Sequence, residues 1–238
     1  MIALLNYIVS KLKKREFKLD NRIKFYNLLG ILYLRFISLL RGSLKSLGFK
    51  KRGKILFFGK GVKIKHKNFI ELGNGVTIED YVLLDGLSRE GLILGDNVKV
   101  GSYSIIACSG NLTNLGKGIR IKSNSGIGDF CFFGAAGGIS IGSNVIMGQN
   151  VRFHSENHNF DRIDIPIKEQ GVTNKGIFVG DDCWIGSGVV FLDGVQVGEG
   201  CVIGANSLVN KDIPPYSVAV GNPVKVIKNR KKFKEAGR

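Results

Sequence analysis

The sequence lacks the paired cysteines of a zinc ribbon, and in 238 residues it has only three histidines, four prolines and one tryptophan. None of the four cysteines, at 108, 131, 183 and 201, forms a CxxC pair, so zinc-ribbon chemistry is not expected. Cys183 and Cys201 lie eighteen residues apart, and we expect reduced, buried side chains. We expect a cytoplasmic chain without a signal peptide, because the charges of MIALLNYIVSKLKKR follow its apolar part and no small-residue cleavage site is present.

Acidic residues are also scarce, with 19 Asp and Glu against 35 Lys and Arg, which gives a formal net charge of +16. The excess lies at the two ends: residues 1–54 carry fourteen basic residues against two acids, and residues 223–238 carry seven against one. Basic ends suit anionic lipid or nucleic acid equally well on charge alone, and simple solvated charge is the third interpretation. The nearly neutral middle argues against a nucleic-acid partner.

Residues 25–47 have apolar side chains at helical spacing, which predicts one or two helices. The most apolar part, residues 28–40, is shorter than the roughly 20 residues needed to cross a bilayer, so a membrane span is not expected. The segment either caps a neighbouring domain or lies in the lipid interface. We favour peripheral contact with the inner face of the cytoplasmic membrane, because the nearby charge is dense and of one sign. The residues expected to face headgroups are Lys11, Lys13, Lys14, Arg15, Arg41, Lys45, Lys50, Lys51 and Arg52.

Residues 177–209 repeat with a period of six. Bulky apolar residues occur at 179, 185, 191, 197, 203 and 209, and glycine follows four of them. A helix requires apolar residues every three to four positions and an amphipathic strand every two, so neither fits. A six-residue period is typical of a parallel β-helix, in which each apolar residue points inward and three sixes complete one triangular coil. The sequence therefore predicts an all-β solenoid.

The same period, with phase shifts that we attribute to insertions at corners, extends back to Phe58. One longer insertion, about 154–176, interrupts it, and Pro214 and Pro215 end it. We therefore expect a basic helical region over 1–54, a β-helix over 55–222, and a basic tail over 223–238, whose last part, residues 228–238, is a short helix or disordered. Insertions in solenoids form surface loops, which often carry function.

Three segments resemble the hexapeptide-repeat acyltransferases with a left-handed β-helix, in the sugar O-acetyltransferase group. They are NHNF at 157–160, the run from 181 to 215, and GNPVKVI at 221–227. The resemblance covers about 55–228. It implies an enzyme that transfers an acetyl group from acetyl-CoA to a sugar hydroxyl, in capsule, O-antigen or exopolysaccharide synthesis. It also implies a homotrimer with each active site between neighbouring solenoids, and no metal.

The resemblance assigns His158 as the general base that takes the proton of the acceptor hydroxyl. Histidine suits this role near neutral pH, and a positioned imidazole contributes roughly a hundred- to ten-thousandfold. His154 either orients the acceptor or His158, or is an ordinary loop side chain. Glu156 or Asp161 could fix the imidazole tautomer, or be solvated loop acids.

On the donor side, the resemblance places Trp184 beside the substrates and the Ser187 hydroxyl near the thioester carbonyl, where it could stabilise an oxyanion. A packed aromatic and an ordinary corner serine are the alternatives. Gly186 and Ala205 match positions along the pantetheine arm, although corner geometry explains small residues equally well. The basic residues that match positions near the phosphates of coenzyme A are Lys211, Lys225 and Lys228.

The sequence departs from the galactoside and maltose enzymes of this group. The asparagine that those enzymes carry before the catalytic loop has no clear counterpart at 132–142, and the amino-terminal region is longer and more basic. A lipid-linked or polymer-bound acceptor is therefore favoured over a free sugar. The alternatives are a sugar-nucleotide N-acyltransferase and a non-catalytic β-helix that binds a membrane or a partner. A zinc-dependent γ-class carbonic anhydrase fits poorly, because His66 is far in sequence from the other two histidines.

Overall fold

The computed structural model describes residues 10–11, 16, 18–20, 22–108 and 112–233. The chain divides into a unit of residues 1–37 and a unit of residues 38–238, and we describe each by itself. The second unit contains the predicted β-helix. Of the residues expected to face headgroups, Lys13, Lys14 and Arg15 lie outside the described part of the chain.

A single helix, α2 (Phe25–Lys45), forms where one or two helices were predicted. Its 21 residues at about 1.5 Å each span roughly 32 Å, close to the 30 Å of a bilayer core. It is the one helix among the described residues that is long and apolar enough to cross a membrane by length and composition. The prediction that this segment is too short was therefore wrong, because the helix continues past both ends of the 28–40 run.

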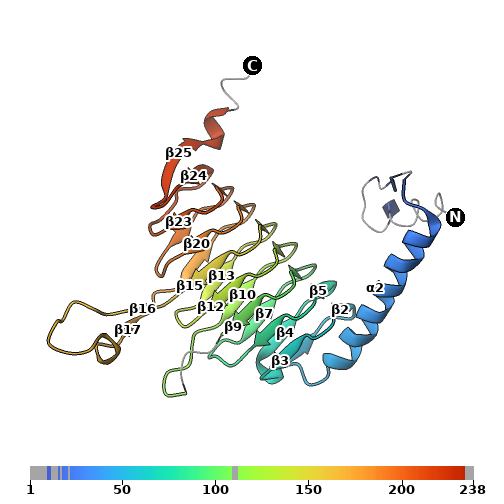
Figure 1. Cartoon of the computed structure of the whole chain (residues 1–238), viewed down its shortest axis with the longest axis horizontal. Coiled ribbons are helices and arrows are strands. Elements are labelled where there is room, and N and C mark those ends of the chain that lie inside the picture. The colour runs from blue at the N-terminus through green and yellow to red at the C-terminus, as the bar shows by residue number, and fades with distance from the viewer. Residues whose placement is uncertain (1–9, 12–15, 17, 21, 109–111, 234–238) are drawn as a thin grey trace. The chain divides into compact units, whose positions relative to one another are not determined.

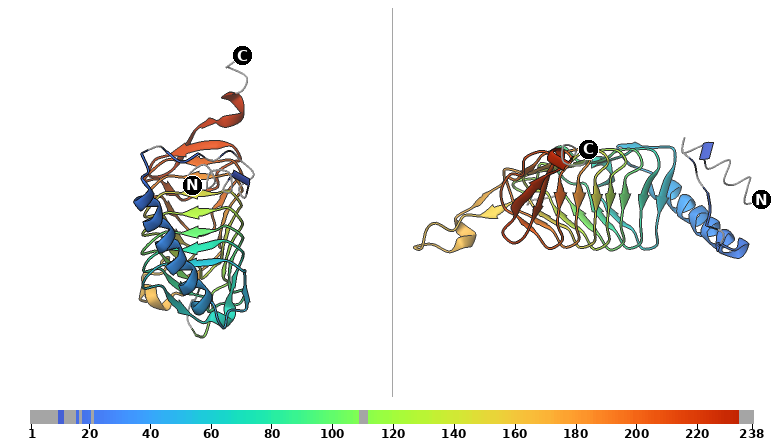
Figure 2. Two further views of the ribbon diagram at one scale, coloured as in Figure 1. Left: turned by 90° about the vertical axis from the view of Figure 1, so that its right-hand side faces the viewer. Right: turned by 90° about the horizontal axis from the view of Figure 1, so that it is seen from above.

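The second unit is a parallel β-helix built from three sheets (Figures 1 and 2). Sheet A contains β1 (Lys51–Arg52), β4 (Ile70–Leu72), β7 (Leu92–Leu94), β10 (Ile119–Ile121), β13 (Ile139–Ile141), β18 (Ile177–Val179) and β21 (Gln196–Val197). Sheet B contains β2 (Leu56–Phe58), β5 (Val76–Ile78), β8 (Lys99–Val100), β11 (Gly126–Ile127), β14 (Ile146–Met147), β19 (Trp184–Ile185), β22 (Val202–Ile203), β24 (Ser217–Val220) and β25 (Lys225–Asn229). Sheet C contains β3 (Lys63–Lys65), β6 (Leu83–Asp85), β9 (Ile105–Ala107), β12 (Phe132–Gly134), β15 (Arg152–His154), β20 (Val190–Phe191) and β23 (Leu208–Val209).

The chain visits sheets A, B and C in turn, so that equivalent positions of successive coils pair directly. Val179 pairs with Val197, Ile185 with Ile203, and Phe191 with Val209. These pairs are eighteen residues apart, which confirms that three sixes complete one coil. All six side chains are fully buried or nearly so.

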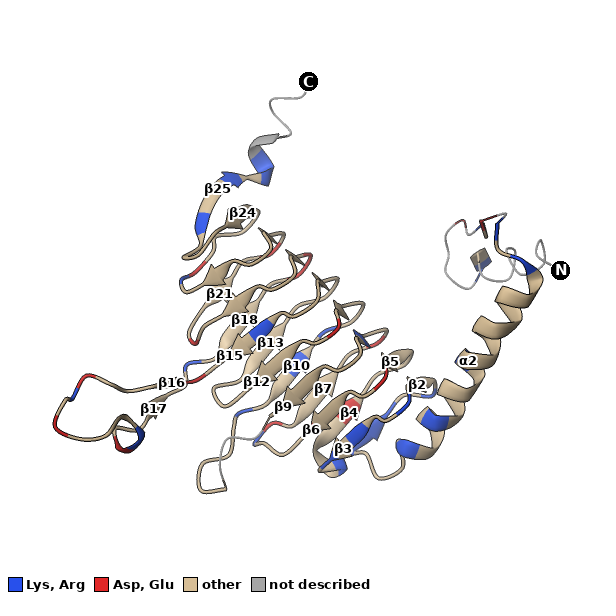
Figure 3. Ribbon diagram, viewed as in Figure 1, with Lys and Arg blue, Asp and Glu red and all other residues tan. Residues whose placement is uncertain are grey.

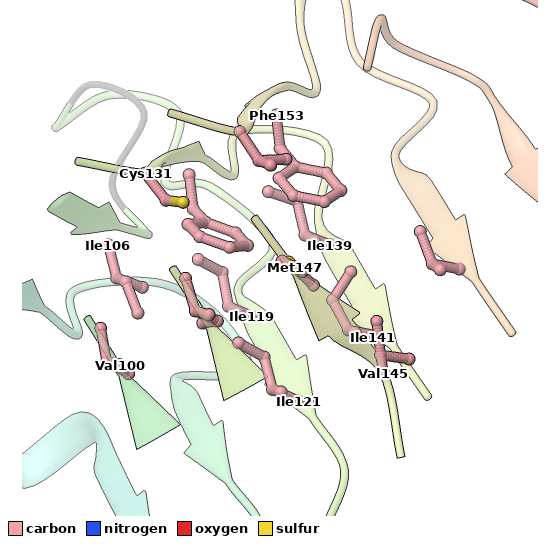
Figure 4. Packing of buried hydrophobic residues seen from close by; sticks show 14 of the residues in the cluster. Val100, Ile106, Ile119, Ile121, Cys131, Ile139, Ile141, Val145, Met147 and Phe153 are labelled. Atoms are coloured by element: carbon pink, nitrogen blue, oxygen red, sulfur yellow. The ribbon is translucent and has the colours of Figure 1, made fainter. Parts of the chain in front are cut away.

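The interior is a continuous stack of apolar side chains (Figure 4). On sheet C, Phe153 lies between Phe133 and Phe191, with ring centroids 4.7 and 4.5 Å apart. All three rings are fully buried, and stacked pairs of this kind add about 0.5–1.5 kcal/mol beyond their burial. The four cysteines are free and buried, as expected.

The three corners of the coil have different characters, and we name them edges AB, BC and CA after the sheets they join. Most turns at edges AB and BC are short. Edge CA contains the longer connections, including the 3₁₀ helix η1 (Lys67–Phe69), residues 86–91 and the outgrowth at 155–176. The phase shifts of the six-residue period therefore accumulate at edge CA.

The carboxyl-terminal segment is a hairpin. Strand β25 pairs antiparallel with β24 in sheet B, and a 3₁₀ helix, η3 (Arg230–Phe233), follows. The prediction of a short helix or disorder was therefore wrong for residues 228 and 229, which are extended, whereas residues 230–233 do form a short helix. The free edge of β24 explains this difference, because its backbone groups need hydrogen-bond partners.

Candidate functional site

The predicted histidine loop is an outgrowth from edge CA that begins where β15 ends. Its stem is a short antiparallel ribbon of β16 (Asn157–His158) and β17 (Val172–Thr173), with His158 opposite Val172. A 3₁₀ helix, η2 (Ile167–Glu169), lies between them. The Gln170 side chain ties the outgrowth together, because its amide donates to the carbonyls of Arg162 at 2.7 Å and Ile165 at 3.1 Å.

His158 lies on the stem of the outgrowth, with its side chain exposed. Among the described residues, its imidazole forms no hydrogen bond or ion pair, and neither Glu156 nor Asp161 contacts it. The predicted carboxylate that would fix its tautomer is therefore not seen. An exposed imidazole with both nitrogens available can accept a proton from a substrate hydroxyl that approaches it.

His154 is the last residue of β15 and lies at the foot of the outgrowth. Its ring is 5.4 Å from the ring of Phe132 and tilted by 35°. Desolvation lowers the pKa of His154, and the positive charge of Arg152 lowers it further. This imidazole is therefore neutral at pH 7 and can position a neighbouring group without adding a charge.

Most of the predicted donor-side residues lie together along sheet B and edge BC. Trp184 is on β19 with 59% of its surface exposed, so it is not a packed residue within this chain. Ser187 follows in the next turn, where its hydroxyl donates to Oε1 of Gln149 at 2.8 Å. A Cβ on Gly186 would lie 2.5 Å from the backbone nitrogen of Ala205, so corner packing by itself requires glycine at 186.

The predicted lysines are divided. Lys225 and Lys228 are exposed on β25, and Lys228 lies in the same row of sheet B as Trp184. Three strand spacings of about 4.8 Å place their backbones roughly 14 Å apart. Lys211 instead follows β23 at edge CA, so it lies apart from these residues.

The outgrowth and Ser187 lie at different edges of the same chain. From Ser187 the chain crosses sheet C through β20 before it reaches edge CA, and six residues at about 3.3 Å each correspond to roughly 20 Å. Proton transfer and oxyanion stabilisation both need contacts near 3 Å. One chain therefore does not bring His158 and Ser187 to the same substrate.

Sequence reasoning missed a groove of about 480 Å³ over sheet A, beside the foot of the outgrowth. Its lining includes Lys117, Arg120, Lys175 and Phe178. A four-residue motif in the sequence could have indicated the groove. It consists of a glycine, an inward apolar residue, an outward residue and a second inward apolar residue, and it marks each strand of sheet A that lines the groove. The five occurrences are GLIL at 91, GIRI at 118, GISI at 138, GIFV at 176 and GVQV at 194.

The described residues do not form a metal site. Within those ranges, no group of three or more His, Cys, Asp or Glu side chains could hold a metal ion. His66 lies at edge CA of the first coil, and its Nδ1 is 2.8 Å from Oδ1 of Asp85, within hydrogen-bond distance.

Comparison with known proteins supports the repeat assignment. Residues 176–211 match the family model described as bacterial transferase hexapeptide (six repeats). The match is confined to this stretch, which contains strands β18 to β23. The predicted resemblance to hexapeptide-repeat acyltransferases is thus confirmed.

Two relatives extend this similarity. A protein of Mycobacterium tuberculosis, named as a probable acetyltransferase, is 34% identical over 207 residues, which cover 85% of this chain and 59% of the relative. A protein of Staphylococcus aureus whose name also describes an acetyltransferase is 41% identical over 117 residues, or 49% of this chain and 57% of the relative. The chain thus spans less than two thirds of the length of either relative.

A solved structure shares the fold. A single-residue mutant of AntD, an N-acyltransferase from Bacillus cereus in complex with dTDP and coenzyme A, superposes with a TM-score of 0.54 at 22% identity. The match covers 82% of this chain and 92% of AntD. The parallel β-helix of this chain is therefore an architecture found among acyltransferases.

Proposed function

We propose that this chain is an acetyl-CoA-dependent O-acetyltransferase that acts on a glycan hydroxyl, with His158 as the general base. The observation that carries the proposal is the histidine-bearing outgrowth on a β-helix whose coils match transferase repeats. The relatives named as acetyltransferases support the acetyl donor, and the coenzyme A bound to AntD supports a groove for it on this fold.

In the proposed reaction, His158 accepts the proton of the acceptor hydroxyl while the hydroxyl oxygen attacks the thioester carbonyl. The hydroxyl of Ser187 donates a hydrogen bond to the oxyanion that forms, after it releases Gln149. When the C–S bond breaks, the imidazolium returns its proton to the leaving thiolate. The products are the O-acetyl ester and free coenzyme A, and His158 is again neutral.

Because His158 and Ser187 lie at different edges, a complete site needs two copies of the chain. Closed rings of identical subunits bring different surfaces of neighbouring copies together. We therefore place the site between copies in a homotrimer. Trp184, Ser187, Lys225 and Lys228 come from one copy, and His158 comes from the next.

Labelled acetyl-CoA and candidate glycans test the activity. His158→Ala should reduce acetyl transfer by roughly a hundred- to ten-thousandfold, because the hydroxyl then lacks a proton acceptor. His66→Ala, at an imidazole far along the solenoid, is the matched control and should retain activity. Transfer that is unchanged in His158→Ala would favour the non-catalytic interpretation, and transfer only to amino-sugar nucleotides would favour the N-acyltransferase.

We also propose peripheral contact with an anionic membrane. Residues 41–67 contain ten Lys and Arg and no Asp or Glu, and many of them lie on the last turns of α2 and on the first coil (Figure 3). Three of the cations expected to face headgroups are engaged in the protein: Lys45 donates to the carbonyl of Val62 at 2.6 Å, Lys50 pairs with Glu71 at 2.8 Å, and Arg52 donates to the hydroxyl of Ser46 at 3.2 Å. Lys51 interacts with Glu71 only at longer range, and Arg41 forms no hydrogen bond or ion pair among the described contacts.

The end of α2 also packs on the first coil, since a Cβ on Gly42 would lie 2.0 Å from the carbonyl oxygen of Leu56. Residues 42–45 therefore cap the solenoid. In the earlier part of the helix, nine large apolar side chains between Phe25 and Leu40 are 45–67% exposed and suit contact with lipid. Sedimentation with anionic vesicles should decrease as salt increases, and a chain that begins near residue 54 should sediment less. Equal sedimentation of both forms would contradict the proposal.

A further inference from the structure

The groove over sheet A, which we call the A groove, runs along five successive coils. Its floor consists of the middle residues of the five sheet A strands, Ile93, Arg120, Ser140, Phe178 and Gln196. Four strand spacings of about 4.8 Å give it a length of roughly 19 Å. A second cavity of about 280 Å³ shares Phe178 and Gln196 and continues toward Pro214 and Pro215.

Three cations and one acid line the A groove. Lys117, Arg120 and Lys175 are exposed, and within the described residues none forms an ion pair with a carboxylate. Glu90, at one end, is the lining acid. The nearby carboxylate of Asp193 accepts hydrogen bonds from the backbone N–H groups of Lys175 and residue 176, at 2.8 and 2.7 Å. Arg120 also interacts at longer range with the carboxylate of Glu71, which does not line the groove. The lining residues of the groove therefore have an excess of positive charge.

The two lysines are held along the wall of the groove by glycines of the following coil. A Cβ on Gly138 would lie 3.0 Å from Cδ of Lys117, and a Cβ on Gly194 would lie 3.1 Å from Cδ of Lys175. Each aliphatic stem thus lies flat across a glycine. Both glycines have positive φ, 94° and 84°, so a larger residue would be strained as well as crowded. This arrangement reduces the side-chain freedom that each lysine would lose on binding an anion.

We propose that the A groove binds the phosphate or diphosphate of the acceptor, so that the acceptor is a phosphate-linked glycan. The proposal rests on the proposed acetyl transfer, since the groove begins at Lys175, the end of the outgrowth that carries His158. Arginine binds phosphate with a planar fork, and lysine binds it as a point charge. Phe178, 45% exposed on the floor, and the polar side chains of Ser140 and Gln196 suit a sugar beside the phosphates.

Phosphates on an acceptor and on coenzyme A are chemically alike, so the two sources must be separated. Of the three lysines matched to coenzyme A, Lys225 and Lys228 lie on sheet B, which is a different face from the A groove, and Lys211 is not among the residues that line the groove. The two sites should therefore respond to different substitutions.

Calorimetric titration of the full chain with inorganic pyrophosphate tests the proposal without any acetyl transfer. Arg120→Gln should weaken pyrophosphate binding roughly ten- to hundredfold, which is the effect of losing a charged hydrogen-bonding partner. Lys175→Gln should weaken it by a smaller factor, and both effects should diminish at high salt. Lys99→Gln, an equal change of charge on sheet B, is the control and should bind like the wild type. Titration with uridine diphosphate and with a short polyprenyl diphosphate then distinguishes a nucleotide-linked from a lipid-linked acceptor.

Three results would overturn the assignment. In the first, Arg120→Gln and Lys175→Gln bind pyrophosphate as the wild type does. In the second, they lose acetyl-CoA affinity by the same factor as pyrophosphate affinity, which would assign the groove to the donor. In the third, light scattering shows that they change the oligomeric state, which would make the groove a contact between copies. Failure of acetyl transfer with intact pyrophosphate binding would contradict the proposed function and leave the anion site in place.

Discussion

Acetyl transfer that is lost in two separate variants should return when their chains assemble together. His158→Ala removes the proposed base from edge CA, and Ser187→Ala removes the proposed oxyanion donor from edge BC. Each should cost roughly a hundredfold or more by itself. The chain path between the two positions is roughly 20 Å, so neither residue can complete a site with its partner in the same chain.

In a ring of copies, each site takes His158 from one chain and Ser187 from its neighbour. In a trimer that contains both variants, one of the three interfaces unites an intact histidine with an intact serine. Mixed trimers should therefore recover about a third of wild-type activity. The assay is initial-rate acetyl transfer by co-expressed variants with two different affinity tags, purified through both tags in sequence.

Two controls make this result specific. The double variant His158→Ala/Ser187→Ala, mixed with the wild type and purified in the same way, tests whether assembly itself occurs and should give about a sixth of full activity. Each single variant assembled with itself should remain inactive. If the mixed oligomers form and stay as inactive as the single variants, both residues act within one chain and the intersubunit site is wrong. A monomeric active protein would refute it equally.

Three further predictions concern the solenoid itself. Gly128→Ala should reduce the free energy of unfolding by about 1–3 kcal/mol, because the added Cβ would lie 2.3 Å from the carbonyl oxygen of Gly148. Gly126→Ala, two residues earlier, places its Cβ in open space and should be neutral or slightly stabilising. Urea unfolding of the two variants measures the difference. Phe153→Ala should cost about 3–5 kcal/mol in the same assay, because a fully buried ring between two others is removed. The pKa of His154 is lowered in the folded state, so folding favours the neutral imidazole. The wild type should therefore lose stability relative to His154→Gln as the pH falls through the range in which histidine titrates. The measurement is the Tm of both proteins at pH 8 and pH 5. An equal Tm difference at both pH values would contradict this.

The inward half of the fold could be predicted because inward positions obey one simple rule. A residue such as Ile185 or Phe191 meets its equivalents in neighbouring coils, so it must be apolar at each repeat. The period of six therefore located the coils and the insertion. The helical spacing over 25–47 predicted α2 nearly to its ends, whereas the apolar run over 28–40 is shorter than the helix, because α2 contains polar and charged residues that reduce its apolarity without ending it.

The outward half of the site was harder to predict. Outward residues have no partner that fixes their type, so the row from Ile93 to Gln196 shows no common chemistry, although it forms one floor. The resemblance predicted a role for His158 and another for Ser187, and it carried no information about which edge each occupies. The edge at which a residue lies could be predicted only by counting residues through every turn of the coil. The insertions at edge CA change that count, so the sequence alone does not show the edge.

The position of the outgrowth follows from the physics of stacked coils. A turn at edge AB or BC has only a few residues in which to bring the chain into register with the next coil. These turns are tightly stacked, because a Cβ added to Gly128, Gly142 or Gly186 would lie within 3 Å of the backbone of the next coil. At edge CA, glycines at positive φ start the sheet A strands, as at 118, 138 and 176. This conformation lets the chain re-enter the sheet after a connection of almost any length. Catalytic loops can therefore grow at edge CA without disturbing the core, whereas the small, tightly stacked residues at edge BC suit a narrow cofactor arm. A chemistry that uses both edges must then join different copies.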